Sequence, residues 1–453
     1  MKIIKNRSFY KNILLITVPI ALQNLITLAT SMMDSLMLGR AEDTGLFLSA
    51  SSLANQPFFI LSLIAFGLAS ASTVLTAQYW GKRDMESIRR IISIAVKVAF
   101  LLSAVMGCAV LFAPEWVMSL YSNNDAVIEA GARYLRIVGI SYFTFGFSST
   151  MLCSIRGIEL VRISVIVNLT SFFMNTFLNW VLIFGKLGAP ALGIEGAAIA
   201  TLTARITELI ITVIYIFFVD KRLQLRPKDL LSFDKTLALD FLRYGTPVFL
   251  NELIWSLGIT IQSAILGHIN YASGDPVAAN SIAGMVQQLS TVVIFGVANS
   301  AAVIIGKSIG GGFTERAKDE SSTFFLLSVL LGIAACGVII LIKDPVIGFY
   351  TVPEETRALA SELMIVIAFV TIFVSISTTS IVGILRSGGD TKFCLILEMA
   401  ALWLVAIPLA LGASWLRFPV AAVLILMKID EPIKSVISFF RMRSDKWMKS
   451  LTR

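Results

Sequence analysis

The sequence predicts an all-α polytopic membrane protein with twelve transmembrane helices in two parallel six-helix repeats around a central cleft. Hydrophobic residues make up 57% of the 453 residues and charged residues only 15%, so most of the chain suits lipid better than water. The apolar residues form near-continuous runs of ~20 residues, the length of a membrane-spanning helix. None of these runs alternates in polarity as a barrel strand does.

The two halves of the chain also echo each other at a nearly constant offset. Pro19 and Leu38-Gly39 in the first half match Pro247 and Leu266-Gly267 in the second. Further matches are Phe66–Ala69 with Phe295–Ala298, Gly81 with Gly310, Tyr121 with Tyr350, and Ile155-Arg156 with Leu385-Arg386. Because six spans return the chain to its starting side, the second repeat enters the membrane in the same direction as the first.

Twelve spans fit the apolar runs. They cover residues 13–38, 53–79, 91–113, 134–155, 163–184, 193–219, 244–267, 278–305, 321–342, 360–384, 393–413 and 418–440. Lys428, Asp430, Glu431 and Pro432 interrupt the last one, so we expect either two pieces or a helix whose lower half is packed in protein. The spans define an N-terminal lobe (1–219), a linker with a short surface helix (220–243), and a C-terminal lobe with a basic tail (244–453).

Lys and Arg residues are distributed unevenly between the two sides. The N-terminus, the alternate loops and the tail hold roughly four times as many of them as the opposite loops, which predicts that both termini lie in the cytoplasm. We expect the membrane to be a plasma (inner) membrane of bacterial type. The net charge of +8 is spread around one membrane face, so it implies no nucleic-acid partner. We expect a monomer surrounded by membrane lipids.

The sequence contains no template for an enzyme. The four cysteines lie singly within spans, and the single histidine, His268, follows the outer end of the seventh span. Metal-ligand spacing, a phosphate-binding glycine loop and a Ser-His-acid set are all lacking from the sequence. We therefore predict a protein that is not an enzyme, needs no cofactor, and acts as a secondary transporter driven by an ion gradient.

Asp34 is the charged residue of the first span that most needs an explanation. An ionisable side chain inside a span costs a few kcal/mol on insertion scales, and Asp34 lies about 6 Å below the outer end of its helix. It is either a carboxylate hydrogen-bonded at the outer interface or a site for a proton or Na⁺. The second alternative follows because a carboxylate in a partly dry cavity takes up a proton or a cation.

Three polar residues of the fifth and sixth spans lie at a similar depth. Asn179, Asn175 and Thr201 are about 8, 14 and 12 Å below the outer surface. Asn175 and Asn179 are four residues apart and share a helix face. Their amide oxygens, a hydroxyl and the carboxylate of Asp34 are ligands that Na⁺ or a proton-carrying water network would use. Single Asn and Thr residues more often join helices, so the predicted cation site depends on the four residues together.

Arg205 and Glu208 are candidates for coupling in the sixth span. They share a helix face with Thr201, and Arg205 lies near the membrane midplane, where an unpaired guanidinium is improbable. Two roles are open for the pair. It is a structural ion pair, or Arg205 exchanges partners as the cavity loads and empties.

Glu252 and Gln262 are the corresponding candidates in the seventh span. Glu252 lies about 12 Å from the cytoplasmic end and is either a cleft residue for a cationic substrate or a structural hydrogen-bonding group. Its repeat partner is Asn24, whereas Gln262 is the repeat partner of Asp34. Glu398 lies nearer the inner interface, where we expect it to snorkel.

Four motifs along the chain carry a family resemblance. They are Met33-Asp34 with Leu38-Gly39-Arg40, Ala77–Lys82, Gly193–Thr201 and Leu385–Lys392. Together they resemble the multidrug and toxic compound extrusion (MATE) family of cation-coupled exporters, over nearly the whole chain. The resemblance implies export of amphipathic, mostly cationic organic compounds such as drugs, by antiport with Na⁺ or H⁺. The family's cation site is an Asp in span one, an Asn and an Asp one turn apart in span five, and a Thr in span six, and Asp34, Asn175 and Thr201 match it.

Two departures from the family pattern affect the ion. Asn179 stands where many relatives carry an acid, so the choice between Na⁺ and H⁺ stays open. Some relatives also carry acids in spans seven and ten. Here Glu252 sits about one turn earlier than the first of these, and span ten offers only Glu362 at its outer start, so the resemblance does not support an ion site in the C-terminal lobe.

Two other functions remain open. A flippase for lipid-linked precursors shares the two-lobed architecture, but its cleft should be strongly cationic to hold pyrophosphate, and Arg205 is the only deep basic residue that the spans place there. A non-transporting membrane scaffold or receptor is the alternative of another class, with the linker and the basic tail as its docking surfaces.

Overall fold

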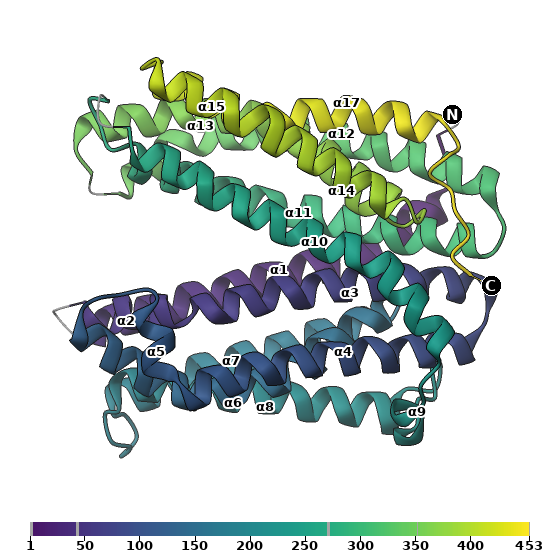
Figure 1. Ribbon diagram of the computed structural model, residues 1–453, viewed down its shortest axis with the longest axis horizontal. Coiled ribbons are helices and arrows are strands. Elements are labelled where there is room, and N and C mark those ends of the chain that lie inside the picture. The colour runs from purple at the N-terminus through teal and green to yellow at the C-terminus, as the bar shows by residue number, and fades with distance from the viewer. Residues whose placement is uncertain (1–2, 42–44, 270–271, 351, 453) are drawn as a thin grey trace. The chain divides into compact units, whose positions relative to one another are not determined.

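The computed structural model describes residues 3–41, 45–269, 272–350 and 352–452, and these contain helices but no β-strand. The helices of the first half (Figure 1) are α1 (Arg7–Ala41), α2 (Leu46–Ala54), α3 (Gln56–Lys82), α4 (Met85–Phe112), α5 (Pro114–Ser119), α6 (Asp125–Arg156), α7 (Arg162–Phe184), α8 (Gly193–Ile214) with the π-helical η1 (Tyr215–Val219), and α9 (Pro227–Leu231). Those of the second half are α10 (Lys235–Gly267), α11 (Pro276–Gly310), α12 (Thr314–Gly348), α13 (Glu354–Thr378), η2 (Thr379–Leu385), α14 (Thr391–Met399), η3 (Ala400–Ala406), α15 (Ile407–Trp415), α16 (Val420–Met427) and α17 (Asp430–Arg443).

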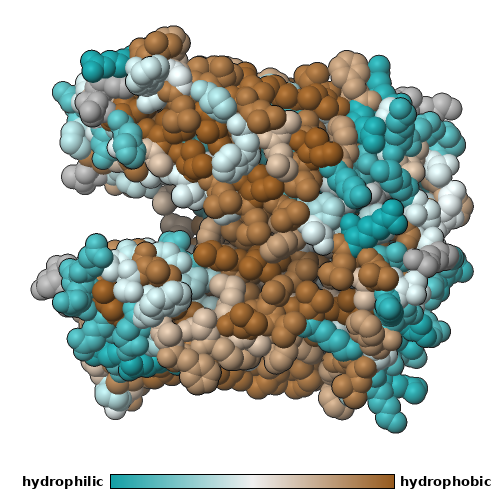
Figure 2. Space-filling view, viewed as in Figure 1, coloured by the Kyte–Doolittle hydropathy of each residue, from teal (hydrophilic) through white to brown (hydrophobic). Residues whose placement is uncertain are grey.

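The chain is a multi-pass membrane protein. Among the described residues, 11 helices are long and apolar enough to cross a membrane, and they match the first eleven predicted spans. The predicted twelfth span consists of two pieces, α16 and α17, which meet at Lys428 and Ile429. Hydrophobic side chains cover the middle of the face shown in Figure 2, and hydrophilic side chains gather at its two ends. The short helix expected in the linker is α9.

The chain forms two compact units. Unit 1 comprises Met1–Ala21, Ala77–Arg83 and Arg243–Arg453, and unit 2 comprises Leu22–Thr76 and Asp84–Leu242. Helices α1 and α3 therefore each contribute one end to unit 1 and the remainder to unit 2. Pro19, which removes one backbone hydrogen bond from α1, lies next to the point where that helix passes from one unit to the other.

Unit 2 positions the candidate site through the close packing of α7 against α8. A Cβ atom on Gly196 would lie only 2.7 Å from the backbone oxygen of Leu182, so a glycine is needed for the two backbones to come this near. Apolar side chains on α6 and α8, including Leu135, Tyr142 and Ala197, are buried in the core of the unit. This packing holds the polar residues of α7 and α8 side by side.

In unit 1, the end of α3 crosses the end of α11 at two glycines. A Cβ atom on Gly81 would lie 2.0 Å from the backbone oxygen of Lys307, and one on Gly310 would lie 1.8 Å from that of Gln78. Any larger residue would clash with backbone, so these positions require glycine. Gly81 and Gly310 are also partners in the internal repeat, so equivalent points of the two halves meet at this crossing.

Gln78 joins the crossing to the C-terminal tail. Its side chain is fully buried; Nε2 donates to the backbone oxygen of Ser387 (2.8 Å), and Oε1 accepts from the backbone N–H of Leu451 (2.8 Å). Trp447, also buried, packs over Gly388. The start of α1 and the segment after α17 lie at the same end of unit 1 (Figure 1), as an even number of membrane crossings requires.

Candidate functional site

Asp34, Asn179, Asn175 and Thr201 form a continuous chain of hydrogen bonds in unit 2. The side-chain amide of Asn179 donates to Oδ1 of Asp34 (2.5 Å) and to Oδ1 of Asn175 (3.2 Å). The amide of Asn175 in turn donates to the hydroxyl of Thr201 (3.4 Å). The structure thus brings together, from α1, α7 and α8, the four residues that depth along the helices had grouped.

One buried oxygen in this series of hydrogen-bonded side chains accepts no hydrogen bond from the described residues. Asn179 is completely buried and uses its amide N–H groups on Asp34 and Asn175, whereas its Oδ1 has no hydrogen bond among the described residues. Buried polar atoms in folded proteins are almost always satisfied. A free acceptor next to a carboxylate suits either a bound cation or the O–H group of a protonated Asp34.

Tyr134 and Asn55 border the site and were missed in the sequence. The Tyr134 hydroxyl lies 3.5 Å from Oδ1 of Asn55, and it also hydrogen-bonds with Thr201. Tyr134 begins the predicted fourth span, where tyrosine is ordinarily an interfacial residue. The helix α6 actually begins at Asp125, which places Tyr134 well inside the bundle. Asn55 lies at the break between α2 and α3, which the continuous apolar run concealed.

Arg205 lies beside this chain with its charge compensated. Its guanidinium is 2.9 Å from Oε2 of Glu208, whose side chain is 6% exposed. The rings of Phe58 and Phe145 lie 5.3 and 5.0 Å from the guanidinium carbon, within the range of cation–π attraction. Arg205 also interacts electrostatically with Asp34. The Arg205–Glu208 pair foreseen from spacing is therefore present, close enough to Asp34 to respond to its charge.

Glu252 is bound to Arg386 in unit 1. The two side chains form an ion pair of 2.8 Å and are 11% and 3% exposed. Arg386 follows the end of η2 at Leu385, as the predicted spans place it, but its side chain is buried. Its repeat partner in unit 2, Arg156, donates to Oε1 of Gln23 on α1 (3.3 Å). Both halves thus use this arginine to contact their first helix, with an acid in one half and an amide in the other.

The structure corrects two expectations about buried charge. Arg205 is not the only deep basic residue, because Arg156, Arg386 and Lys434 are 8%, 2% and 3% exposed. Glu398 does not snorkel to the interface; it is buried and lies 3.0 Å from the ammonium of Lys434. Arg386 and Lys434 are both paired with acids, so these two do not supply the uncompensated positive charge that a pyrophosphate site requires. Arg156 donates instead to the neutral amide of Gln23.

Gln262 hydrogen-bonds with no carboxylate in the described part of the chain, although it holds the position of Asp34 in the repeat. Its Nε2 donates to the backbone oxygen of Met427 (2.9 Å), and its Oε1 accepts from Nζ of Lys428 (3.0 Å). These contacts lie at the junction of α16 and α17. The seventh span therefore meets a lysine at a position equivalent to the one where the first span carries an acid.

Relatives of the chain match it over almost its full length. A protein of Thermotoga maritima described as probable multidrug resistance protein NorM is 24% identical over 97% of this chain and 93% of its own. A protein of the same description from Rhizobium meliloti is 29% identical over 88% of this chain and 84% of its own. The multidrug resistance protein PmpM of Pseudomonas aeruginosa is 22% identical, with coverage of 91% and 86%.

Solved structures share the fold. One described as MATE in complex with MaL6 superposes with a TM-score of 0.85 at 19% identity, over 96% of this chain and 95% of the other. An outward-facing multidrug resistance MATE family transporter of the MOP superfamily gives a TM-score of 0.83 at 17% identity, over 98% of each chain. These likenesses confirm the predicted twelve-helix fold.

The family model MatE matches the chain twice, at residues 19–181 and 247–411. The two matches begin at Pro19 and Pro247, the prolines that open the internal echo, so one family unit describes each half. Together they cover well over half of the sequence. The chain therefore belongs to the MatE family of transporters, which are not enzymes.

Proposed function

We propose that this protein is a secondary active transporter that exports drugs and other amphipathic, mostly cationic organic compounds by antiport with Na⁺ or H⁺. The names of the relatives, which describe multidrug resistance proteins, support the export of organic compounds. The hydrogen-bonded chain that links Asp34 to Asn179, Asn175 and Thr201 supports ion coupling. We place the protein in the plasma (inner) membrane as a monomer, with both termini in the cytoplasm.

The single observation that carries the coupling proposal is the unpartnered Oδ1 of Asn179 next to the carboxylate of Asp34. Either coupling ion would satisfy this oxygen. Na⁺ would gain oxygen ligands from Asp34, Asn179 and Asn175, while a proton on Asp34 would provide an O–H donor. The site is thus built to exist in a loaded and an unloaded form.

Coupling then requires that ion and drug favour different states of the transporter, since equal affinity for both states shifts nothing. In this mechanism, an ion from outside loads Asp34 and removes its negative charge from the surroundings of Arg205. Arg205 then interacts more strongly with Glu208, the helices of the first lobe shift, and substrate leaves the outward-open cleft. Return of the empty cleft releases the ion inside.

Glu252 and Gln262 have a conditional role in this proposal. Glu252 would hold a cationic substrate only after exchanging Arg386 for it, because one carboxylate cannot fully compensate two cations. Such an exchange would leave Arg386 without its carboxylate partner inside the bundle. Release of the substrate would then be favoured, because it allows Arg386 and Glu252 to form their ion pair again. Gln262 would transmit changes at Lys428 to the seventh span.

Transport by reconstituted protein tests the proposal. We expect wild-type proteoliposomes to move a fluorescent organic cation against its gradient when a proton or a Na⁺ gradient is imposed. Without either ion gradient, we expect no such transport. Asp34→Asn should reduce gradient-driven transport to background, because the neutral amide cannot load an ion. Asp344→Asn is the matched control, since Asp344 forms an exposed pair with Lys343. Full gradient-driven transport by Asp34→Asn would refute the assignment, and transport by neither gradient would refute the antiport.

Transport of drugs also separates this function from the alternatives. A flippase would move labelled lipid-linked precursor between leaflets, and a scaffold or receptor would show no turnover with either substrate. Only the exporter should confer dye efflux on a transporter-deficient host. An ionophore should abolish this efflux.

A further inference from the structure

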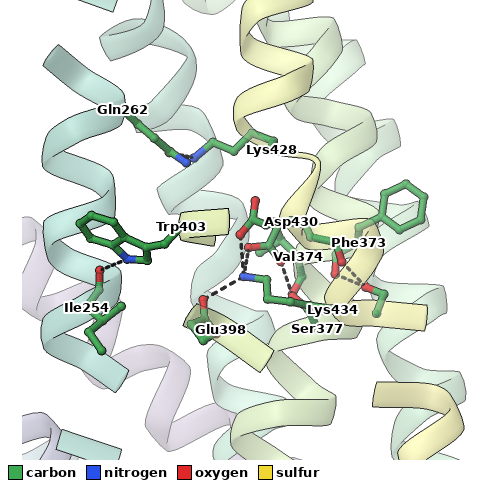
Figure 3. Close-up of polar contacts among 12 residues, drawn as sticks. Ile254, Gln262, Phe373, Val374, Ser377, Glu398, Trp403, Lys428, Asp430 and Lys434 are labelled. Atoms are coloured by element: carbon green, nitrogen blue, oxygen red, sulfur yellow. Dashed lines mark hydrogen bonds and ion pairs between the residues drawn. The ribbon is translucent and has the colours of Figure 1, made fainter. Parts of the chain in front are cut away.

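A second cluster of buried charges lies in unit 1 around the ammonium group of Lys434. Nζ of Lys434 contacts Oε1 of Glu398 (3.0 Å), Oδ2 of Asp430 (2.9 Å) and Oε1 of Glu431 (2.7 Å), as Figure 3 shows in part. The four side chains are at most 12% exposed. Three carboxylates from α14 and α17 thus converge on one cation in the interior of the unit.

The neighbouring charges leave this cluster short of positive charge. Lys428 also interacts with this cluster: its Nζ donates to Gln262 (3.0 Å), and it interacts electrostatically with Asp430 and Glu431. With every group ionised, the three carboxylates face two ammonium groups. One negative charge therefore remains in the interior, where an uncompensated charge is strongly unfavourable.

The other helices packed against α17 do not correct this balance. From α13, the hydroxyl of Ser377 donates to Glu431, which satisfies an oxygen but adds no charge. Arg386 and Cys394 interact electrostatically with each other and with Glu398. Arg386 is, however, already paired with Glu252. Farther along α17, Arg441 binds Asp390, to which Lys449 of the tail is also bound.

One atom marks where the missing positive charge would be received. Oδ1 of Asp430 is buried without a hydrogen-bond partner among the described residues, and Asp430 as a whole is 4% exposed. Lys434 cannot satisfy this oxygen, because an ammonium has three N–H donors and each already meets a different carboxylate. In Figure 3, the carboxylate of Asp430 lies beside Lys434 with one oxygen directed away from it.

A proton fits this position better than a metal cation. Lys434 occupies the point on which the carboxylates converge, so Na⁺ could reach them only by displacing a lysine that is held by three ion pairs. A proton on one of the carboxylates removes the excess charge and needs no room. Because the carboxylates interact strongly, the proton belongs to the cluster as a whole.

The backbone at this place has the form of a transporter ion site. Ion sites in secondary transporters are typically built where a membrane helix is discontinuous, and Asp430 and Glu431 form the first turn of α17 directly after the break from α16. Gln262, the repeat partner of Asp34, contacts the same break through Met427 and Lys428. Each half of the chain thus has a polar site against its first helix.

We propose that the cluster of Glu398, Asp430, Glu431 and Lys434 is a second proton-binding site, which holds one proton in addition to the ion bound at Asp34. This inference extends the proposed antiport, since a proton taken up and released in the C-terminal half would add to the charge exchanged per transport cycle. The cluster's chemistry also makes it selective for protons, whichever ion Asp34 takes.

Infrared difference spectroscopy of the purified protein in detergent tests the site without measuring transport. The carbonyl stretch of a protonated carboxyl group is resolved from that of a carboxylate, and its intensity is followed as the pH is raised. The measurement is made in the Asp34→Asn protein, so that the carboxyl of Asp34 cannot contribute to the band. We expect this protein to show a buried protonated carboxyl whose band is lost when Asp430→Asn is added, because the neutral amide removes the excess negative charge. Asp344→Asn, an exposed acid, is the control and should keep the band.

A second variant protects the test against misfolding. Glu398→Gln removes the same charge from another helix and should also remove the band, with size-exclusion chromatography to verify that each variant is folded. A band that persists when Asp430→Asn or Glu398→Gln is added to the folded Asp34→Asn protein would overturn the proposal. The transport assay separates the two proposals. If the variants lose the band but the wild-type protein shows no gradient-driven transport, the proton site stands and the antiport is refuted. If the wild-type protein shows gradient-driven transport but the variants keep the band, the antiport stands and the proton site is refuted.

Discussion

The glycine crossing between α3 and α11 makes a strong prediction about stability. In Gly310→Ala, the new Cβ atom would lie 1.8 Å from the backbone oxygen of Gln78, so the two helices must separate by about 1.6 Å to reach an ordinary contact of 3.4 Å. The atom in the way belongs to the backbone and has no rotamer to change. The strain is therefore at the upper end of overpacking costs, about 3 kcal/mol.

The neighbouring hydrogen bonds increase this cost. The side chain of Gln78, which lies at this crossing, hydrogen-bonds with the backbone of Ser387 and of Leu451. The loss of each bond costs about 1 kcal/mol. The helix propensity of alanine returns about 1 kcal/mol. The expected net loss for Gly310→Ala is thus about 4 kcal/mol, large enough to lower the thermal midpoint clearly.

Thermal unfolding of purified protein in detergent, followed by tryptophan fluorescence, measures the effect. Gly337→Ala is the control, because a Cβ atom there meets nothing within 4 Å, and it should be neutral or slightly stabilising. In Gly81→Ala/Gly310→Ala, the second substitution should cost much less than it does alone, because helices already forced apart do not clash again. Equal midpoints for Gly310→Ala and Gly337→Ala would refute the reasoning.

Two further predictions concern the buried polar groups. Asn179→Asp should shift the pH range of gradient-driven transport upward, because a second carboxylate beside Asp34 raises its proton affinity; transport over a series of pH values measures this, Asn168→Asp on the same helix is the control, and identical profiles for both variants would contradict the idea. Arg386→Met should destabilise the folded protein by about 3–5 kcal/mol, because it leaves Glu252 buried and unpaired; the double variant Glu252→Gln/Arg386→Met should recover most of the loss, and thermal unfolding in which the double variant is as unstable as the single one would rule out this account.

Sequence reasoning predicted most of the fold because lipid restricts the chain so strongly. Every backbone group in the membrane must be satisfied within a helix, so runs of apolar residues identify the helices with few alternatives. The repeat between Pro19 and Pro247 then determined the topology. The chain of Asp34, Asn175, Asn179 and Thr201 could be grouped because depth follows from helix rise and the two asparagines share a face.

The rest depends on contacts that no local pattern contains. Glu398 and Lys434 come from different spans, and only the packing of α14 against α17 shows that they meet. The apolar run placed Tyr134 at the start of its span, but α6 already begins at Asp125, so Tyr134 lies deeper than the run indicates. Arg386 follows the tenth span as predicted, but no local pattern shows that it is buried against Glu252.

The charged junction between α16 and α17 has a consequence for how the protein is made. On the scale of translocon-mediated insertion, each charged residue at the centre of a helix costs about 2.5–3.5 kcal/mol, so Lys428, Asp430, Glu431 and Lys434 together would oppose entry into lipid by roughly 10 kcal/mol. Their partners Glu398 and Gln262 lie in segments synthesised earlier. The segment from α16 to α17 therefore becomes stable in the bilayer only after the preceding helices of its half have inserted. Its insertion during biogenesis thus depends on the correct placement of those helices.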